Sequence, residues 1–318
     1  MISYEVKEND KVVRRGKVSL DVAPQEKKEL AVNVSGLKAK VGTEYFVNFS
    51  VTTLESEPLV PKGYEIAHEQ FRLPIELASR SFSVQGPALQ CSENGNLLSV
   101  QSSRVAFVFD KSTGLVTSYK VKGTEYFHEG FGIQPNFWRA PNDNDYGSQM
   151  PKRLQIWKQS SKNFNVVDAS LAMDGKDAVL KVSYLLAAGN LYIATYRIHP
   201  SGVVKANYTF TSTEMEAAKT EASEATLMAT FTPGNEAIRK ESSKLVVPRI
   251  GVRFRLPAEM EQVTYFGRGP EENYCDRNNG TLVGEYQATA EQMYFPYVRP
   301  QENGHHTDTR WLMLKKKM

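Results

Sequence analysis

The sequence lacks the features that mark several broad classes of protein. It has only two cysteines, Cys91 and Cys275, which lie far apart and form no C-x-x-C pair. We therefore expect two reduced thiols, with a single disulfide as the alternative. No apolar run approaches the roughly 18 residues of a membrane span, and nothing near Met1 resembles a signal peptide. A net charge of +3 is too small to indicate nucleic-acid binding. The sequence predicts neither a membrane nor a nucleic-acid partner.

Catalytic signatures are also missing. The chain has no G-x-S-x-G, no phosphate-binding loop and no dinucleotide fingerprint. It shows no eightfold strand–helix alternation of a (β/α)₈ barrel. His305 and His306 stand near Glu302 and Asp308, and His306 and Asp308 would share one face of a strand. Because no further ligand follows at a diagnostic spacing, we interpret them as loop histidines and expect no metal site.

What the sequence does contain is a series of short alternating strands. At 318 residues it is long enough for two domains. Val18, Leu20 and Val22 alternate with polar residues before Pro24, and a second period of two runs from Tyr45 to Val51. Residues 1–75 are therefore predicted to form a small antiparallel β-sandwich similar to immunoglobulin domains, without their Cys–Trp–Cys signature.

Residues 76–96 are rich in Gly, Pro, Ser, Gln and Asn, and the whole stretch Pro74–Asn96 is typical of a linker. Residues 97–318 are predicted to form a second, larger β domain. Its clearest strands are a hairpin around residues 105–121 and a meander over residues 178–210, and another strand is expected within residues 245–256. The best helix candidate is Met150–Lys162, and residues 212–224 are predicted to form an exposed loop.

The most unusual stretch is Thr264–Arg310. It reads T-Y-F-G-R-G-P-E-E-N-Y-C-D-R and later F-P-Y-V-R-P-Q-E-N-G. Its paired carboxylates and arginines predict a charge network around Tyr274, formed by Glu271, Glu272, Asp276 and Arg277. We interpret this network as a brace between loops rather than as catalytic machinery.

A second charged stretch lies at Asn136–Gly147, N-F-W-R-A-P-N-D-N-D-Y-G. The run Asp143, Asn144 and Asp145 superficially suggests calcium, but the further Gly and Glu of the calcium loop are missing. The favoured interpretation is a turn held by Asx hydrogen bonds and by an ion pair between Arg139 and one aspartate.

These stretches resemble the C-terminal region of the large β-galactosidases of glycoside hydrolase family two. That family carries G-x-G-P-x-E-x-Y-x-D-R, then P-Y-V-x-P-x-E-N-G, and earlier F-x-R-A-P-x-D-N-D-x-G. The segment Gly63–Leu73 is similar to its G-x-x-x-A-x-x-Q-x-x-L strand, on which His68 and Glu69 would be surface positions. The resemblance implies an all-β fold: an immunoglobulin-like sandwich followed by a β-supersandwich that is galactose mutarotase-like.

The resemblance also implies a role. In the family both catalytic glutamates lie on a barrel that would precede residue 1, so this chain is expected to be a non-catalytic region that supports the barrel and the wall of the substrate site. No cofactor is expected, because the family's Mg and Na ions bind mostly elsewhere. Trp311 lies too early to match the family's sugar-pocket tryptophan, so the second domain is expected to be C-terminally incomplete and prone to self-association.

The expected partners are the remainder of a β-galactosidase polypeptide, a second copy of the chain, and carbohydrate. Location in the cytoplasm or the periplasm stays open. The residues predicted to bind carbohydrate or to form the structural networks are Arg139, Asp143, Asn144, Asp145, Arg268, Glu271, Tyr274, Asp276, Arg277, Glu302 and Asn303.

Two alternatives remain open. A mutarotase-like aldose epimerase requires a histidine and a carboxylate that converge on the concave face of a sheet. A stand-alone carbohydrate-binding module requires exposed aromatic side chains in a row, whereas Tyr192, Tyr196 and Tyr208 are predicted to lie in the core.

Overall fold

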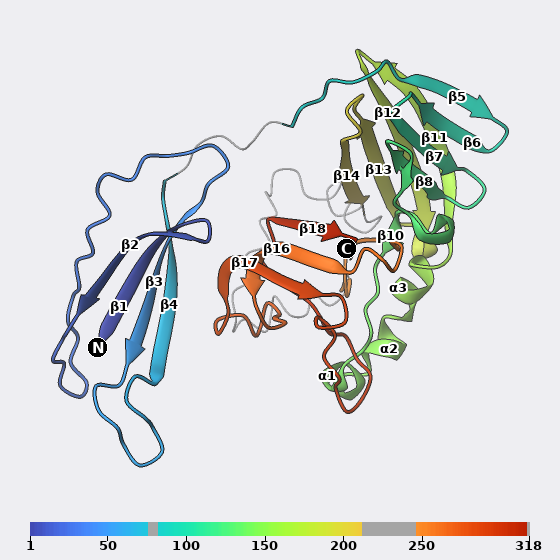
Figure 1. The fold of residues 1–318 in the computed structure, drawn as a ribbon. Coiled ribbons are helices and arrows are strands. Elements are labelled where there is room, and N and C mark those ends of the chain that lie inside the picture. Colours follow the sequence, from blue (N-terminus) through green and yellow to red (C-terminus); the bar gives the residue numbers. More distant parts are fainter. Residues whose placement is uncertain (76–81, 212–245, 317–318) are drawn as a thin grey trace, which may run out of the picture. The chain divides into compact units, whose positions relative to one another are not determined.

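The computed structural model describes residues 1–75, 82–211 and 246–316, and their regular secondary structure is mostly antiparallel β-strand (Figure 1). The all-β prediction is confirmed. The chain divides into two compact units. The first contains Met1–Ser81, Glu259–Pro296 and Asn303–Met318, and the second contains Phe82–Ala258 and Tyr297–Glu302. Within the described ranges, no helix has the length and apolar character needed to cross a bilayer.

The first unit begins with a four-stranded antiparallel sheet in the order β2-β1-β3-β4. Its strands are β1 Ile2–Glu8, β2 Lys11–Val18, β3 Tyr45–Thr52 and β4 Glu65–Leu73. The alternation predicted from Tyr45 to Val51 is confirmed as β3. The alternation from Val18 to Val22 is not a strand, because β2 already ends at Val18. The described residues between Val18 and Tyr45 contain no strand, and within this segment the carbonyls of Asn33 and Ser35 accept from Arg14 of β2.

The same unit has a three-stranded sheet in the order β17-β16-β18. Its strands are β16 Gln262–Gly269, β17 Leu282–Thr289 and β18 Trp311–Lys315. Phe46 of β3 forms a buried apolar cluster with Phe266 of β16 and Val283 of β17. The last strands of the chain therefore pack with its first sheet. The domain boundaries expected from the sequence, after residues 75 and 96, remain a prediction.

The second unit is built on two antiparallel sheets around one large core. One contains β5 Gln90–Asn94, β6 Leu97–Gln101, β7 Val105–Asp110, β8 Leu115–Val121 and β9 Thr124–Glu125. The other contains β11 Phe164–Asp174, β12 Asp177–Leu186, β13 Leu191–Ile198 and β14 Val204–Thr211. Alternate residues of β7, β12 and β13 are buried, as the period of two predicted. Tyr192 and Tyr196 are each 1% exposed and Tyr208 packs against them, so their predicted core position is confirmed.

One part of the predicted linker is a strand. Gln90–Asn94 pairs with β6 as strand β5, although its composition is polar. It forms the edge of its sheet and four of its five side chains are exposed, so it needs few apolar residues.

Short elements complete the second unit. They are η1 His128–Gly130, β10 Gln134–Asn136, α1 Asp143–Gly147, α2 Met150–Arg153, α3 Gln155–Ser160, η2 Ala187–Gly189 and β15 Gly251–Arg253. The predicted helix at Met150–Lys162 is confirmed as two helices separated at Leu154, with Trp157 buried. The strand expected within residues 245–256 is limited to β15, which pairs with β10. The loop predicted at residues 212–224 lies outside the described residues.

Candidate functional site

Two polar clusters, one in each unit, contain seven of the eleven residues that the sequence singled out; Asn144, Glu271, Asp276 and Asn303 belong to neither. We call the first the Asn273 cluster. Its members come from the end of β16, from the loop after it and from the segment before β18: Arg268, Glu272, Asn273, Tyr274, Arg277, His305, Thr307 and Asp308. We call the second the Arg139 cluster, formed by Arg139, Asp143, Asp145, Arg249, Arg299 and Glu302.

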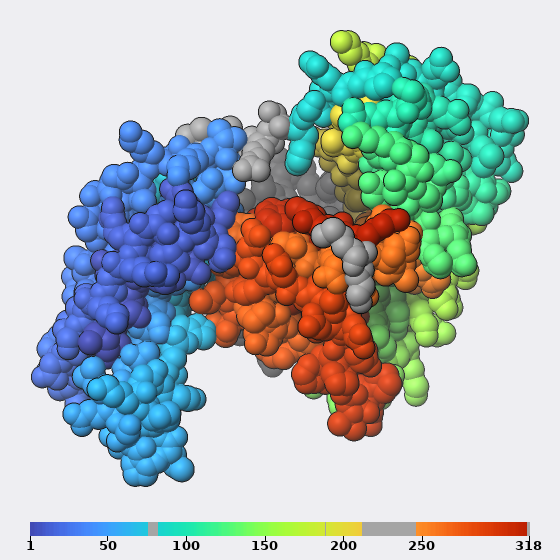
Figure 2. All heavy atoms as spheres, in the orientation of Figure 1, coloured from blue at the N-terminus to red at the C-terminus, as the bar shows by residue number. Residues whose placement is uncertain are grey.

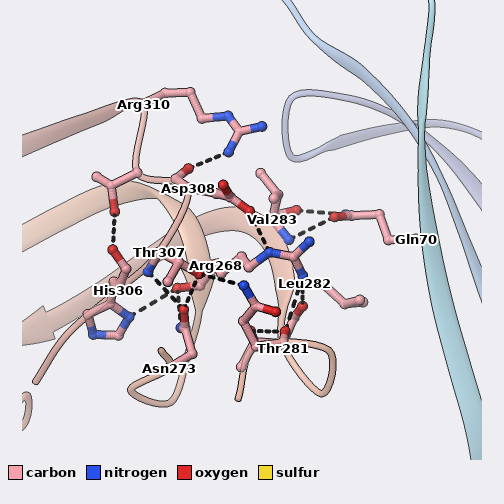
Figure 3. Close-up of polar contacts among 12 residues, drawn as sticks. Gln70, Arg268, Asn273, Thr281, Leu282, Val283, His306, Thr307, Asp308 and Arg310 are labelled. Carbon is pink, nitrogen blue, oxygen red and sulfur yellow. Dashed lines mark hydrogen bonds and ion pairs between the residues drawn. The ribbon is translucent and has the colours of Figure 1, made fainter. Parts of the chain in front are cut away.

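Asn273 is the centre of the first cluster and is fully buried. Its amide nitrogen donates to the backbone carbonyls of Arg268, at 3.1 Å, and of Glu271, at 3.0 Å. Its carbonyl oxygen accepts from the backbone nitrogen and the hydroxyl of Thr307, at 2.8 and 2.6 Å (Figure 3). One side chain thus ties together two segments 34 residues apart. Because each half of the amide is satisfied, its burial stabilises the loops.

Arg268 forms a second link in the same cluster. Its Nε donates to the Asp308 carboxylate at 2.7 Å, and its Nη1 donates to the carbonyls of Thr281, at 2.7 Å, and Asn278, at 3.2 Å (Figure 3). The guanidinium therefore fixes the start of β17 relative to the segment that precedes β18.

The predicted charge network around Tyr274 is present only in part. Glu272 accepts from Arg277 at 2.9 Å and from the backbone nitrogen of Gly304 at 2.7 Å. The Tyr274 ring stacks on His305, with centroids 5.1 Å apart, and the Arg277 guanidinium lies over the Tyr274 ring, 5.3 Å from its centroid. Glu271 and Asp276 are exposed, and neither has an ion pair to another described residue. Glu272 is half-buried, so the two adjacent carboxylates have different surroundings.

Two glycines explain why this stretch is glycine-rich. A Cβ on Gly269 would lie 2.3 Å from the Tyr265 hydroxyl and 2.8 Å from the Tyr286 ring. Gly304 has φ +71°, and a Cβ there would lie 2.9 Å from a backbone oxygen. Asn303, the residue before Gly304, is half-buried and interacts with another residue.

The Arg139 cluster contains the ion pair that the sequence predicted. Arg139 binds Asp145 through two parallel hydrogen bonds of 2.5 and 2.8 Å. Asp145 also accepts from the backbone nitrogen of Asn142, whose side chain accepts from the Asp145 nitrogen in return. This reciprocal pair is a capping box, and it starts the short helix α1. The predicted turn with Asx bonding is therefore a capped helical turn.

The Asp143–Asp145 run does not converge on a common point. Asp143 is exposed and pairs with Arg299 at 2.7 Å, Asn144 is exposed, and Asp145 is occupied by Arg139. This geometry agrees with the preference for a turn over a calcium loop. Among the described residues, no three His, Cys, Asp or Glu side chains gather closely enough to hold a metal ion.

Glu302 connects two segments that no sequence pattern links. It forms an ion pair with Arg249 and accepts from the backbone nitrogen of Ala140 at 3.3 Å. Arg249 and Arg299 were missed at the sequence level. Their partners lie 53 and 156 residues away, and no local pattern could have indicated them.

The histidines do not follow the predicted strand geometry. Residues 305–308 form loop and turn, so the shared strand face expected for His306 and Asp308 is wrong. The reason is that His306 turns inward, where its Nδ1 lies 3.0 Å from the Arg268 carbonyl and 3.1 Å from the Tyr265 hydroxyl. Their interpretation as loop residues is confirmed, and so is the surface position of His68 and Glu69 on β4.

A histidine–carboxylate pair, which the epimerase alternative requires, does occur in the second unit. His199 Nδ1 lies 2.8 Å from the Asp177 carboxylate, but Arg197 binds the same carboxylate at 3.1 Å and also binds Asp174 at 2.7 Å. These contacts hold the end of the β11–β12 hairpin. The His199–Asp177 pair therefore has a structural role that needs no substrate.

Comparison with known proteins identifies relatives along nearly the whole chain. The family model described as "Beta galactosidase small chain" matches residues 101–318, and the model described as "Beta-galactosidase, domain 4" matches residues 1–74. A β-galactosidase of Priestia megaterium is 30% identical over 97% of this chain, and one of Lactococcus lactis is 29% identical over 89% of it. In each case the chain spans about 27% of the relative's length.

Proposed function

Because this chain belongs to the β-galactosidase small-chain family, we propose that it serves as the non-catalytic C-terminal region of a β-galactosidase, an enzyme that removes terminal β-D-galactose. Its partner is then the remainder of that polypeptide, which carries the catalytic glutamates. The chain's own contribution is to hold loops in the positions that the catalytic part requires.

The observation that carries this proposal is that Asn273 is buried with its side-chain hydrogen bonds satisfied within the chain. A fully buried amide that satisfies two backbone carbonyls on one loop and Thr307 on another has no capacity left for a substrate. Arg139 and Asp145 likewise bind each other through both oxygens. Such groups orient backbone and do not transfer protons. We propose that any Mg²⁺ or Na⁺ of the whole enzyme binds outside this chain.

A chimera tests the proposal. The matching part of the Priestia megaterium β-galactosidase is replaced by this chain, and hydrolysis of a chromogenic β-galactoside is measured. We expect activity in the chimera, and none in the enzyme without this part or in the purified chain alone. Turnover by the purified chain that is lost on mutation of one of its own residues would overturn the proposal.

We also propose that the isolated chain associates with itself through β18. This strand forms an edge of its sheet, and Trp311, Leu312 and Met313 on it are exposed. Figure 2 shows that the red C-terminal part of the chain reaches the visible surface. An edge with unpaired backbone groups and apolar side chains is a template for strand pairing.

A further inference from the structure

The first unit contains a cavity of about 790 Å³ that none of the polar clusters explains. It lies between the first sheet and the end of the β16–β17 hairpin, and its walls include Ser50 and His68 on one side and Glu271 and Tyr286 on the other. The volume falls within the range of small-molecule sites, roughly 300–1,000 Å³.

The two walls are fixed to each other by specific contacts. Gln70 of β4 donates to the Val283 carbonyl at 2.9 Å and accepts from the Val283 nitrogen at 2.8 Å (Figure 3). Arg310 binds Glu44 at 2.9 Å, and the buried cluster with Phe46 lies nearby. The cavity is therefore a property of the folded unit.

The floor of the cavity is a polar sheet face. Ser3 stands opposite Lys17 on β2 and opposite Ser50 on β3, so these three side chains are neighbours on one face. The Ser50 hydroxyl donates to Glu65, whose carboxylate also lies 2.9 Å from His68 Nδ1. Hydroxyls, an amide and carboxylates thus offer both donors and acceptors to a ligand.

Charged groups of both signs line the cavity. Glu5 is paired with Arg15 at 2.8 Å, and Lys7 with Asp10 at 3.4 Å. Glu65 contacts His68 at 2.9 Å, and the structure shows neither Lys17 nor Glu271 in an ion pair with a described residue. A strongly charged ligand would meet a like charge on one wall, whereas a neutral ligand rich in hydroxyls can use groups of both signs.

Aromatic rings complete the lining. Tyr4 and Phe49 lie beside each other, with centroids 6.3 Å apart, and Tyr286 lies in the opposite wall. Rings supply apolar surface for the C–H faces of a sugar, while the polar floor meets its hydroxyls. A lipid would leave that polar floor unsatisfied.

We propose that this cavity is a binding site for a neutral mono- or disaccharide, with Glu271 and the Ser50–Glu65–His68 group as its polar contacts. The site lies outside both polar clusters. It does not depend on the proposed function, because its test measures binding and not hydrolysis.

The experiment titrates the purified chain with lactose and with cellobiose and follows ligand saturation transfer by NMR. The blocking variant is Gly280→Trp, since Gly280 lines the cavity and a Cβ there meets no atom within 4 Å. The matched control is Gly147→Trp, at a similarly open glycine in the other unit. A second variant, Glu271→Gln, keeps the shape and removes the charge.

We expect at least one disaccharide to bind the wild-type chain and the Gly147→Trp control equally. Gly280→Trp should abolish binding, and Glu271→Gln should weaken it about tenfold, the effect of losing a charged hydrogen-bond acceptor. Equal melting temperatures will show that the variants fold. Wild-type chain that binds neither sugar, or binding that survives Gly280→Trp, overturns the proposal.

Discussion

At the scale of single residues, the polar side chains of the two clusters differ mainly in how far they are removed from water. The Arg139 and Asp145 side chains are 25% and 12% exposed, whereas those of Arg299 and Asp143 are 66% and 72% exposed. Desolvation makes the loss of one partner costly, while an exposed pair is screened by solvent. The Arg139–Asp145 pair is therefore expected to stabilise the unit more than the Arg299–Asp143 pair, although their distances are similar.

This difference gives the first prediction. Arg139→Ala leaves the Asp145 carboxylate without its two charged hydrogen bonds and should lower the free energy of unfolding by about 3 kcal/mol. Arg299→Ala, the matched control, should change it by less than about 1 kcal/mol. Chemical denaturation of both variants measures these values. An unchanged Arg139→Ala stability would show that the α1 turn does not depend on the pair.

The second prediction concerns two tyrosines near the Asn273 cluster. Burial raises the pKa of both Tyr265 and Tyr286 from 10.0 to about 12. The folded chain therefore keeps phenolic protons that the unfolded chain loses near pH 10. The stability that comes from these two raised pKa values is fully present below about pH 10 and is lost as the pH rises towards about 12.

We expect Tyr286→Phe to make this alkaline loss of stability less steep, because one of the two phenols is gone. The hydrogen bond from Tyr286 to the Leu282 carbonyl is lost at every pH, so the slope and not the absolute stability is the readout. Denaturation curves between about pH 9 and pH 12 provide the measurement, with Tyr64→Phe at an exposed ring as the control. Parallel curves for wild type and Tyr286→Phe would refute the assignment.

At the scale of elements, the sheets differ in how their edges are protected. Strand β5 covers its edge with polar, mostly exposed side chains. Strand β18 instead exposes Leu312 at 51% and Met313 at 44%, which project from opposite faces of the same edge. Charged side chains normally discourage pairing at an edge, and here they begin only at Lys315.

The third prediction follows from this edge. The purified chain should show a mass that rises with concentration in analytical ultracentrifugation, and Leu312→Lys should shift it towards the monomer by placing a charge on the pairing strand. Leu59→Lys, at a fully exposed loop position, should have no such effect. A wild-type chain that stays monomeric over a wide concentration range would contradict self-association through β18.

At the scale of the whole molecule, each compact unit has its own buried centre. The second unit contains a large core of aromatic and aliphatic side chains from two sheets. The first contains fewer buried apolar side chains, among them Tyr45, Tyr265 and the Phe46, Phe266 and Val283 cluster, together with the buried Asn273. The smaller apolar centre indicates that polar contacts carry a larger share of the stability of the first unit.

The fourth prediction is that scanning calorimetry will resolve two unfolding transitions. Asn273→Ala removes four hydrogen bonds from the first unit and should lower one transition by an amount equivalent to about 2–3 kcal/mol. Arg139→Ala should lower the other. Asn279→Ala, at an exposed position on the Asn273 loop, serves as control. A single transition that both variants shift equally would show that the units unfold together.

The sequence by itself determined the β-rich class, most strands with a regular alternation, and an ion pair between Arg139 and a nearby aspartate, which the structure identifies as Asp145. These depend on side-chain periodicity and on contacts between residues only six positions apart. It also carried the motifs that resemble β-galactosidases. The strand predicted after Val18 failed because alternation alone does not provide a neighbouring strand to pair with.

Only the tertiary structure decided which polar residues distant in the sequence meet. Glu302 binds Arg249, Arg299 binds Asp143, and Asn273 binds Thr307 because strands distant in sequence bring their loops together. The saccharide cavity is of the same kind, since Ser3, Glu65 and Glu271 become neighbours only when the last strands pack near the first sheet. Local patterns extend over a few residues, whereas such contacts arise from packing that buries apolar surface of the whole unit.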